Sequence, residues 1–361
     1  MINNIQNISD LWPNLARLTE KQREMILKIL NNLEFKNTLI WTPPWSVGNI
    51  QDCFGLPFNP VSGITYRGLN SLWLSSQGYS DPRWFTENQI ERAGLVFKQD
   101  IAESTQELGT QIEFSMEYDS NTKKPFNAKQ DFIVQMSRLE KIDYMNNYVS
   151  HPHVTHTVYN ASLLSNIVPY RVPDSELAFR NSLLEELLKN SEAPIKFVGC
   201  STPLYDIEKD EIRLPVRSAF ASQVSFYGVA LHEMGHSTAH RSRLNRPITG
   251  AIGSQAYAQE ELRAEFASVI IGARYGLALT DEHVANHAAY IVHWKSLIRN
   301  NPLCLFAALR DACKIAQYVE ERAKTIISLA KLRGTTQLIP SKSTFTNPSY
   351  ATPSKRLCMS I

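Results

Sequence analysis

The stretch His232-Glu233-Met234-Gly235-His236 constrains this chain more than any other, because it fits the helical pattern H-E-x-x-H. Positions four apart lie on one face of a helix, so the two histidines can offer imidazole nitrogens to a single zinc ion. Glu233 follows the first histidine, near enough to act as general base towards a zinc-activated water without binding the metal. The apolar run from Phe226 to Leu231 indicates a buried helix. The alternative is a chance pair of histidines.

Catalytic zinc needs a third protein ligand. His240 is a poor candidate, because on a straight helix it lies about 12 Å along the axis from His232. The segment from Tyr257 to Ser268 predicts a second helix, on which Glu261 and Glu265 are four residues apart on one face. We expect Glu261 to be the third ligand and Glu265 to orient a ligating histidine through its other ring nitrogen. Glu260 is the nearest competitor and a second candidate for that orienting role, and acids on a solvated helix face are the alternative.

Three segments together carry a resemblance to a known family. The motif at 232–236, the stretch His240-Arg-Ser-Arg-Leu-Asn-Arg246 and the stretch Glu260-Glu261-Leu-Arg-Ala-Glu265 resemble the metallopeptidase domain of ArdC-type antirestriction proteins. The same domain occurs in plasmid primases of the TraC type. The resemblance runs from about Tyr205 to about Lys324. It implies a zincin-like domain of the gluzincin type that follows an N-terminal domain binding single-stranded DNA.

The length of 361 residues and the ordinary apolar content predict two globular domains. With the resemblance, they predict an α+β protein whose mixed α/β DNA-binding domain spans residues 1–168. A linker is expected over residues 169–174 and the zincin-like domain over residues 175–333. Residues 334–361 are basic and rich in Ser, Thr and Pro, which predicts a disordered tail. Such a tail could hold DNA, act as a transport signal or only add solubility.

In the N-terminal half, an apolar stripe predicts a helix from Asp10 to Leu33. Alternating residues predict strands over Gln111 to Tyr118 and Phe132 to Leu139, with a turn at Asp119 to Thr122. Val154 to Tyr159 resembles the closing strand of the family's N-terminal domain. His151, His153 and His156 lie beside and within this strand, and we expect structural roles for them rather than metal binding.

Binding of single-stranded DNA combines aromatic stacking platforms with a positive groove. Five of the six tryptophans lie at or before Trp84, but acidic residues outnumber basic ones up to residue 165. The stretch from Leu95 to Gly109 is acidic and lacks the basic turn found in the family. Guided by the resemblance, we expect DNA contacts among Arg67, Trp73, Arg83, Trp84, Arg92, Lys123 and Lys124. The alternative is that the aromatic residues form a core.

In the C-terminal half, Pro203 to Pro215 predicts a β-hairpin with its turn at Ile207 to Asp210. Zincins generally bind a peptide substrate along an edge strand, and Glu211 to Leu214 is the candidate for that edge. A third helix is predicted from Thr280 to Ile298. By analogy with other zincins, His287 or Tyr290 on this helix is expected to donate a hydrogen bond to the oxyanion of the reaction. Pro302 is expected to start a helix that runs to about Leu332.

No stretch resembles a signal peptide or a membrane span, so we expect a cytoplasmic protein without a membrane partner. The five cysteines are scattered and are expected to be reduced. The oligomeric state is not predicted by the sequence.

These inferences predict an antirestriction protein of a mobile element that binds single-stranded DNA and hydrolyses peptide bonds with zinc-activated water. Its expected partners are single-stranded DNA and a peptide or protein substrate. One alternative is a non-enzymatic DNA-binding protein with a structural zinc site. The other is a metallopeptidase effector whose N-terminal domain binds protein rather than DNA.

Overall fold

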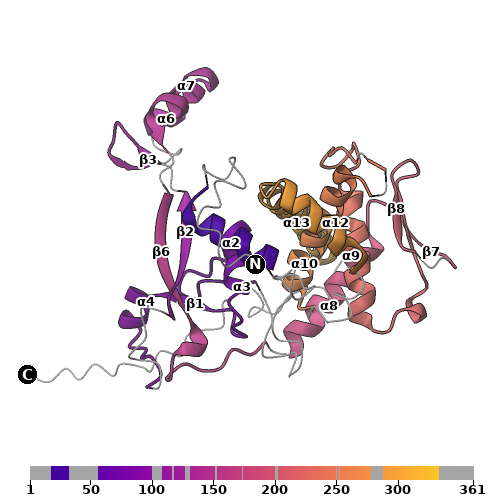
Figure 1. The fold of residues 1–361 in the computed structure, drawn as a ribbon, viewed down its shortest axis with the longest axis horizontal. Coiled ribbons are helices and arrows are strands. Elements are labelled where there is room, and N and C mark those ends of the chain that lie inside the picture. The colour runs from indigo at the N-terminus through magenta and orange to yellow at the C-terminus, as the bar shows by residue number, and fades with distance from the viewer. Residues whose placement is uncertain are drawn as a thin grey trace, which may run out of the picture. The chain divides into compact units, whose positions relative to one another are not determined.

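The computed structural model describes residues 18–31, 56–99, 108–115, 118–126, 131–150, 153–172, 174–199, 202–248, 250–251, 253–277 and 288–332. The chain divides into two compact units, whose elements are labelled in Figure 1. Unit 1 joins residues 1–83 to residues 168–361, and unit 2 spans Trp84–Ile167. Helices and short sheets occur in both units, which confirms the α+β class.

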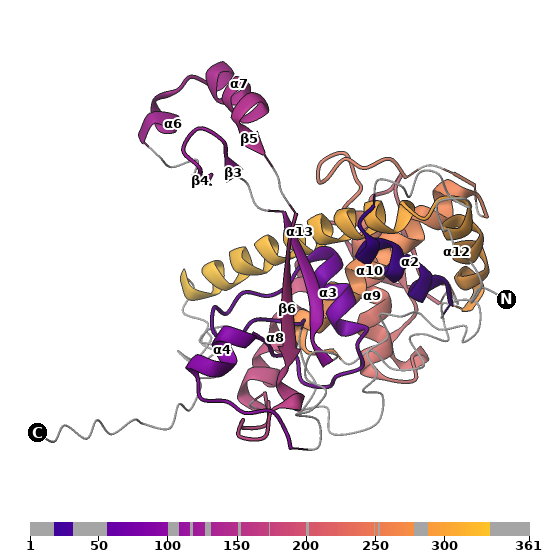
Figure 2. The same ribbon diagram turned by 60° about the vertical axis from the view of Figure 1, so that its left-hand side comes forward.

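Unit 1 consists mainly of helices around one apolar core. Its larger helices are α8 (Asp174–Lys189), α9 (Gln223–Ser237), α10 (Gln255–Tyr275), α12 (Ala288–Asn300) and α13 (Cys304–Leu332). α10 packs against both α9 and α13, and the long α13 runs beside it in Figure 2. The buried Trp294 of α12 donates its indole N–H to the carbonyl of Ala258 in α10 at 3.1 Å. The helix that carries the H-E-x-x-H motif, α9, therefore packs against α10, which also contacts α12 and α13.

Two helices from the N-terminal part of the chain also belong to this core. α2 (Glu20–Asn31) and α3 (Gly68–Ser75) place buried side chains in the same cluster as α8 to α13: Met25, Ile26, Ile29, Leu72 and Trp73. The compact units thus divide the chain near residues 83 and 168, whereas the sequence predicts a single linker at 169–174. Residues 1–17 and 32–55 lie outside the described part of the chain, and so do both ends of the helix predicted from Asp10 to Leu33.

A three-stranded sheet completes unit 1. Its order is β7 (Ile195–Phe197), β9 (Glu211–Leu214), β8 (Leu204–Asp206), with β9 parallel to β7 and antiparallel to β8. The predicted hairpin of β8 and β9 is confirmed. The prediction that Glu211–Leu214 is an edge strand is wrong, because β7 covers its second side and the Ile212 N–H donates to the Pro194 carbonyl at 2.9 Å. Among the described strands of this sheet, β8 is an edge strand that contacts α9, and the other edge strand, β7, also approaches α9 through Phe197.

Unit 2 contains an antiparallel sheet with β6 (His153–Asn160) at its centre, flanked by β1 (Trp84–Thr86) and β2 (Thr110–Ser115). This confirms the strand predicted from Val154 to Tyr159. α4 (Glu87–Arg92) starts directly after β1, where Thr86 and Gln89 form a capping box that satisfies two backbone N–H groups.

An insertion between β2 and β6 carries further elements of unit 2. They are β3 (Tyr118–Asp119), β4 (Lys124–Pro125), α6 (Asp131–Gln135), α7 (Arg138–Tyr148) and β5 (Val149–Ser150). The strand predicted from Phe132 to Leu139 is wrong, because these residues belong to α6, a bend and the start of α7. Ser137 and Glu140 form a capping box that starts α7, with the Ser137 N–H donating to the Glu140 carboxylate at 2.8 Å.

Within the described ranges, no helix combines the length and the apolar composition that crossing a membrane requires. The predicted basic tail, residues 334–361, lies outside those ranges. α13 matches the helix predicted after Pro302.

Candidate metal centre

α9 presents the H-E-x-x-H motif inside the core of unit 1. The Ser222 hydroxyl caps the helix by accepting the Ser225 N–H at 3.0 Å, and the helix continues to Ser237. Gly235 faces α10, where a Cβ added to it would lie 3.4 Å from the Ala264 Cα. Even a Cβ at this position would touch the α10 backbone, so the two helices pack closely here.

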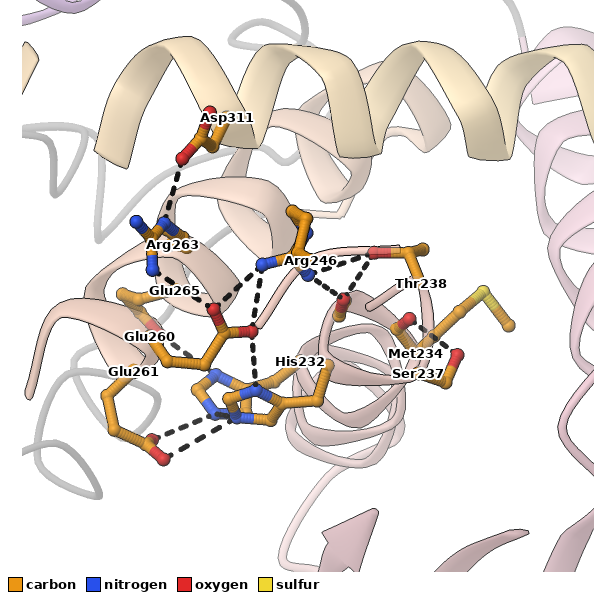
Figure 3. A network of polar contacts seen from close by, with 12 residues as sticks. His232, Met234, Ser237, Thr238, Arg246, Glu260, Glu261, Arg263, Glu265 and Asp311 are labelled. Carbon is orange, nitrogen blue, oxygen red and sulfur yellow. Dashed lines mark hydrogen bonds and ion pairs between the residues drawn. The ribbon is translucent and has the colours of Figure 1, made fainter. Parts of the chain in front are cut away.

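His232, His236 and Glu261 meet between α9 and α10 (Figure 3). The two imidazole Nε2 atoms are 3.1 Å apart, and the Glu261 carboxylate oxygens lie 3.3 Å from His232 Nε2 and 3.6 Å from His236 Nε2. A tetrahedral zinc ion with bonds of about 2.0–2.1 Å places its ligand atoms about 3.3–3.4 Å apart. The three donor groups thus already have the spacing that such an ion requires.

The other two acids of α10 face the opposite ring nitrogens. Glu260 Oε1 lies 3.3 Å from His236 Nδ1, and Glu265 Oε2 lies 3.6 Å from His232 Nδ1. Each histidine therefore has a carboxylate behind it and its Nε2 directed at the shared site. This is the arrangement in which an outer carboxylate fixes the ring orientation of a metal ligand.

The electrostatics of the cluster favour positive charge. Burial lowers the pKa of both imidazoles, but the carboxylates outweigh it, raising the pKa of His236 to about 9 and that of His232 well above 6.5. Burial raises the pKa of Glu261, but hydrogen bonds from both histidines hold it well below its ordinary value. Three buried carboxylates around two imidazoles thus stabilise protons on the imidazoles, and a divalent cation held there would compensate the carboxylate charges in the same way.

Glu233 lies inside the site, close to the edge strand β8. The residue is 7% exposed, and the backbone of Tyr205 in β8 lowers the pKa of its carboxylate slightly. Burial raises the pKa of Glu233, an effect that the charges of the neighbouring histidines partly offset. A carboxylate in this setting is better suited to accept a proton near neutral pH than a solvated one.

A clasp formed by Tyr205, Asp210 and Arg243 ties the β8–β9 hairpin to the end of α9. The Tyr205 hydroxyl donates to Asp210 at 2.8 Å, and the Arg243 guanidinium binds both Asp210 and the Tyr205 oxygen. Arg243 Nε also donates to the Ser237 carbonyl at 2.7 Å. Sequence reasoning missed this clasp and the contacts of Arg246, because ion pairs between loops leave no periodic pattern in the sequence.

The residues expected to stabilise an oxyanion are not placed by the structure. His287 lies outside the described residues, and so does the side chain of Tyr290, although its backbone is part of α12. Their roles stay predictions.

The candidate DNA-contacting residues are distributed over both units. In unit 1, Arg67 is exposed, Arg83 forms an ion pair with Asp81 at 2.6 Å, and Trp73 is only 5% exposed. In unit 2, Trp84 is 1% exposed, whereas Arg92, Lys123 and Lys124 are exposed. The two tryptophans are core residues and present no ring face to a base, contrary to the stacking role expected for them.

Comparison with known proteins identifies two matched regions. A family described as a zincin-like metallopeptidase matches residues 182–311, and the N-terminal domain of the anti-restriction factor ArdC matches residues 19–142. Two DNA primases TraC of Escherichia coli are 33% and 34% identical over 81% and 84% of this chain, which spans only 19% and 27% of their length. An uncharacterised protein, y4eC, of Sinorhizobium fredii is 28% identical over 73% of this chain and 80% of its own length.

Two solved structures of the antirestriction ArdC protein from the R388 plasmid share the fold. The metal-free structure has a TM-score of 0.58 at 23% identity and covers 85% of this chain and 99% of that one. The Mn(II)-bound structure has a TM-score of 0.58 at 22% identity and covers 84% of this chain and 98% of that one.

Proposed function

The chain is an ArdC-type protein, and from this premise we propose that it is a zinc metallopeptidase that binds single-stranded DNA and protects a mobile element from restriction. One observation carries the enzymatic part: His232, His236 and Glu261 offer three donor atoms at tetrahedral spacing beside the buried Glu233. Two imidazoles and a carboxylate form a donor set typical of catalytic zinc. Mn(II) is the alternative metal, because it is bound in the ArdC structure from R388.

Each group at the site has a separate role in the proposed hydrolysis. A bound divalent ion supplies Lewis-acid chemistry, which polarises a carbonyl and makes water more acidic. Glu233 accepts the proton of the attacking water and then delivers it to the nitrogen of the leaving amine. Glu260 and Glu265 fix the two imidazole rings by facing their Nδ1 atoms, and the backbone of Tyr205 lies close to the Glu233 carboxylate.

The proposed strand for binding a peptide substrate is β8, rather than β9 as the sequence predicts. It is an edge strand of the described sheet that contacts α9, and the backbone of Tyr205 in this strand lies close to Glu233. A peptide paired with β8 would present its backbone carbonyls beside the metal ligands.

Metal content and proteolysis test the enzymatic proposal together. We expect one zinc or manganese ion per chain in the wild type and in Glu233→Gln, but none in His232→Ala. With that metal, the wild type should release fragments from a labelled unfolded protein, and Glu233→Gln should release essentially none. Survival of both hydrolysis and protection of incoming DNA in Glu233→Gln would refute the catalytic role and leave the metal a structural one.

The match to the ArdC N-terminal domain supports DNA binding by the N-terminal part of the chain. The exposed cations Arg67, Arg92, Lys123 and Lys124 are the proposed phosphate contacts. Fluorescence anisotropy of a labelled single-stranded oligonucleotide tests this. The dissociation constant should rise steeply with salt, and Lys123→Gln/Lys124→Gln should reduce that salt dependence. Salt-independent or absent binding would favour an N-terminal part that recognises protein.

A further inference from the structure

Arg246 connects the two helices of the metal centre without touching a ligand atom in the described contacts. Its NH1 atom lies 3.0 and 2.7 Å from the two oxygens of Glu260 in α10. Its NH2 atom donates to the Gly235 carbonyl and to the Thr238 hydroxyl oxygen, each at 3.1 Å. Figure 3 shows the guanidinium between Glu260 on one side and the last turn of α9 on the other.

Glu260 depends on this arginine. The carboxylate is 4% exposed, so its charge requires partners that replace water. Arg263 lies farther away, at 3.4 Å, and its Nε is directed at Asp311 at 2.9 Å. Arg246 is therefore the main group that fixes the Glu260 carboxylate, which in turn fixes His236 Nδ1.

The contacts on α9 act on the same histidine. Carbonyls in the last turn of a helix lack intrahelical partners and need other donors. Gly235 directly precedes His236, and its carbonyl accepts both the Thr238 hydroxyl at 2.6 Å and the Arg246 guanidinium. The guanidinium thus holds the backbone before His236 and the carboxylate behind its ring.

The backbone places Arg246 independently of its side chain. Asn245 adopts a left-handed conformation with φ 47°, and the Arg246 N–H returns to the Ala239 carbonyl at 3.1 Å. A substitution at 246 can therefore remove the guanidinium while these backbone hydrogen bonds remain.

We propose that Arg246 is a positioning residue for the metal, because it holds Glu260 and the final turn of α9 in the geometry that directs His236 Nε2 at the site. This inference rests on the proposed metal binding by His232, His236 and Glu261. It predicts that an arginine outside the ligand set controls metal affinity. Charge alone predicts the opposite change in metal affinity, because removing a cation near a bound divalent ion tightens the binding of that ion.

Zinc affinity measured by competition with a chromophoric chelator provides the test, with Arg246→Gln and Arg263→Gln as a matched pair. Both variants lose one positive charge beside Glu260, but only the first loses the contact with Gly235. We expect Arg246→Gln to weaken zinc binding by about 10–100-fold, as is typical for loss of a group that supports a metal ligand, and Arg263→Gln to stay within a few-fold of wild type. Zinc binding by Arg246→Gln as tight as or tighter than wild type would overturn the inference.

Two further variants separate positioning from folding. Arg246→Lys keeps the charge but not the planar fork, so it should still unfold cooperatively without added metal but bind zinc more weakly than wild type. Glu260→Gln should lose affinity by the same route, and Arg246→Gln/Glu260→Gln should lose little more than either single variant. Additive losses would show that the two residues act separately and would overturn the inference. A wild type that binds no metal would instead refute the proposed function.

Discussion

Glu261 is the residue on which the assignment of the metal centre most depends. Its carboxylate lies 3.3 and 3.6 Å from the two Nε2 atoms, whereas Glu260 and Glu265 face Nδ1 atoms. We expect Glu261→Gln to weaken zinc binding by more than about 100-fold, beyond the loss typical of supporting residues. Equilibrium dialysis with metal analysis measures this, with the exposed Glu208→Gln as control. Zinc retained by Glu261→Gln would assign the third ligand to another residue.

At the scale of single residues, the sequence predicts the candidate ligands but not what supports them. The spacing of His232 and His236 follows from helix geometry, and so does the choice of Glu261 over His240, which lies too far along the axis. Arg243 and Arg246 come from an irregular segment. Their partners depend on how that segment folds back on α9, which no residue spacing encodes.

At the scale of elements, the long helices were predictable, and so was the hairpin of β8 and β9. α13 matches its predicted helix because it repeats an apolar face over many turns, whereas α9 and α10 were indicated by the H-E-x-x-H motif and by the spacing of Glu261 and Glu265. Phe132 to Leu139 is too short for a period to separate helix from strand, and in the structure it spans the end of α6 and the start of α7. The prediction that β9 is an edge strand was wrong for another reason. β7 and β9 pair although no turn connects them directly, so the sequence between them does not indicate the pairing.

The clasp between the β8–β9 hairpin and α9 makes an element-scale prediction. Arg243 is almost fully buried, at 3% side-chain exposure, and binds Asp210, the Tyr205 hydroxyl and the Ser237 carbonyl. Arg243→Gln should lower the free energy of unfolding by about 1.5–3 kcal/mol, the value of a charged hydrogen-bonded group. Urea unfolding measures the loss, and zinc stoichiometry should stay unchanged because no ligand is touched. A variant as stable as wild type would mean that the hairpin is held without the clasp.

The insertion in unit 2 should respond to acid through Asp119. Burial raises the pKa of Asp119, but hydrogen bonds from the Thr122 and Asn121 N–H groups and the Tyr144 hydroxyl outweigh it and hold the pKa below its ordinary 3.8. A lowered folded-state pKa means that this stabilisation is complete above pH 3.8 and is lost as the pH falls through the folded-state pKa. Hydrogen-exchange protection of the Asn121 and Thr122 amides should fall over that range in the wild type. Asp119→Asn should show no such transition, and the same acid transition in both proteins would contradict the assignment.

At the scale of the whole molecule, the core of unit 1 joins parts of the chain that the sequence predicts to be separate. The apolar stripe of α2 correctly indicates an amphipathic helix, but it does not indicate what that helix packs against. In the structure α2 and α3 contribute to the same cluster as α9, α10 and α12. The N-terminal segment therefore helps to hold the helices that carry the metal ligands.

This joint core predicts that a substitution more than 200 residues from the metal ligands in sequence destabilises the metal centre. Ile26 is fully buried in α2, with 0% exposure, within the cluster that contains Leu231 and Leu262. Ile26→Ala should lower the free energy of unfolding of unit 1 by about 2–5 kcal/mol, because it removes buried methyl groups and leaves a cavity.

Ile64, at 67% exposure, provides the matched control, and Ile64→Ala should change stability by less than about 0.5 kcal/mol. Urea unfolding followed by tryptophan fluorescence measures both, with added zinc shifting each midpoint upward because the metal binds the folded state. Equal, small effects of the two substitutions would mean that α2 packs on the core without supporting it. The larger loss in Ile26→Ala would place the stability of the metal centre partly in the N-terminal segment, so the zincin-like segment alone should bind zinc less stably than the full chain.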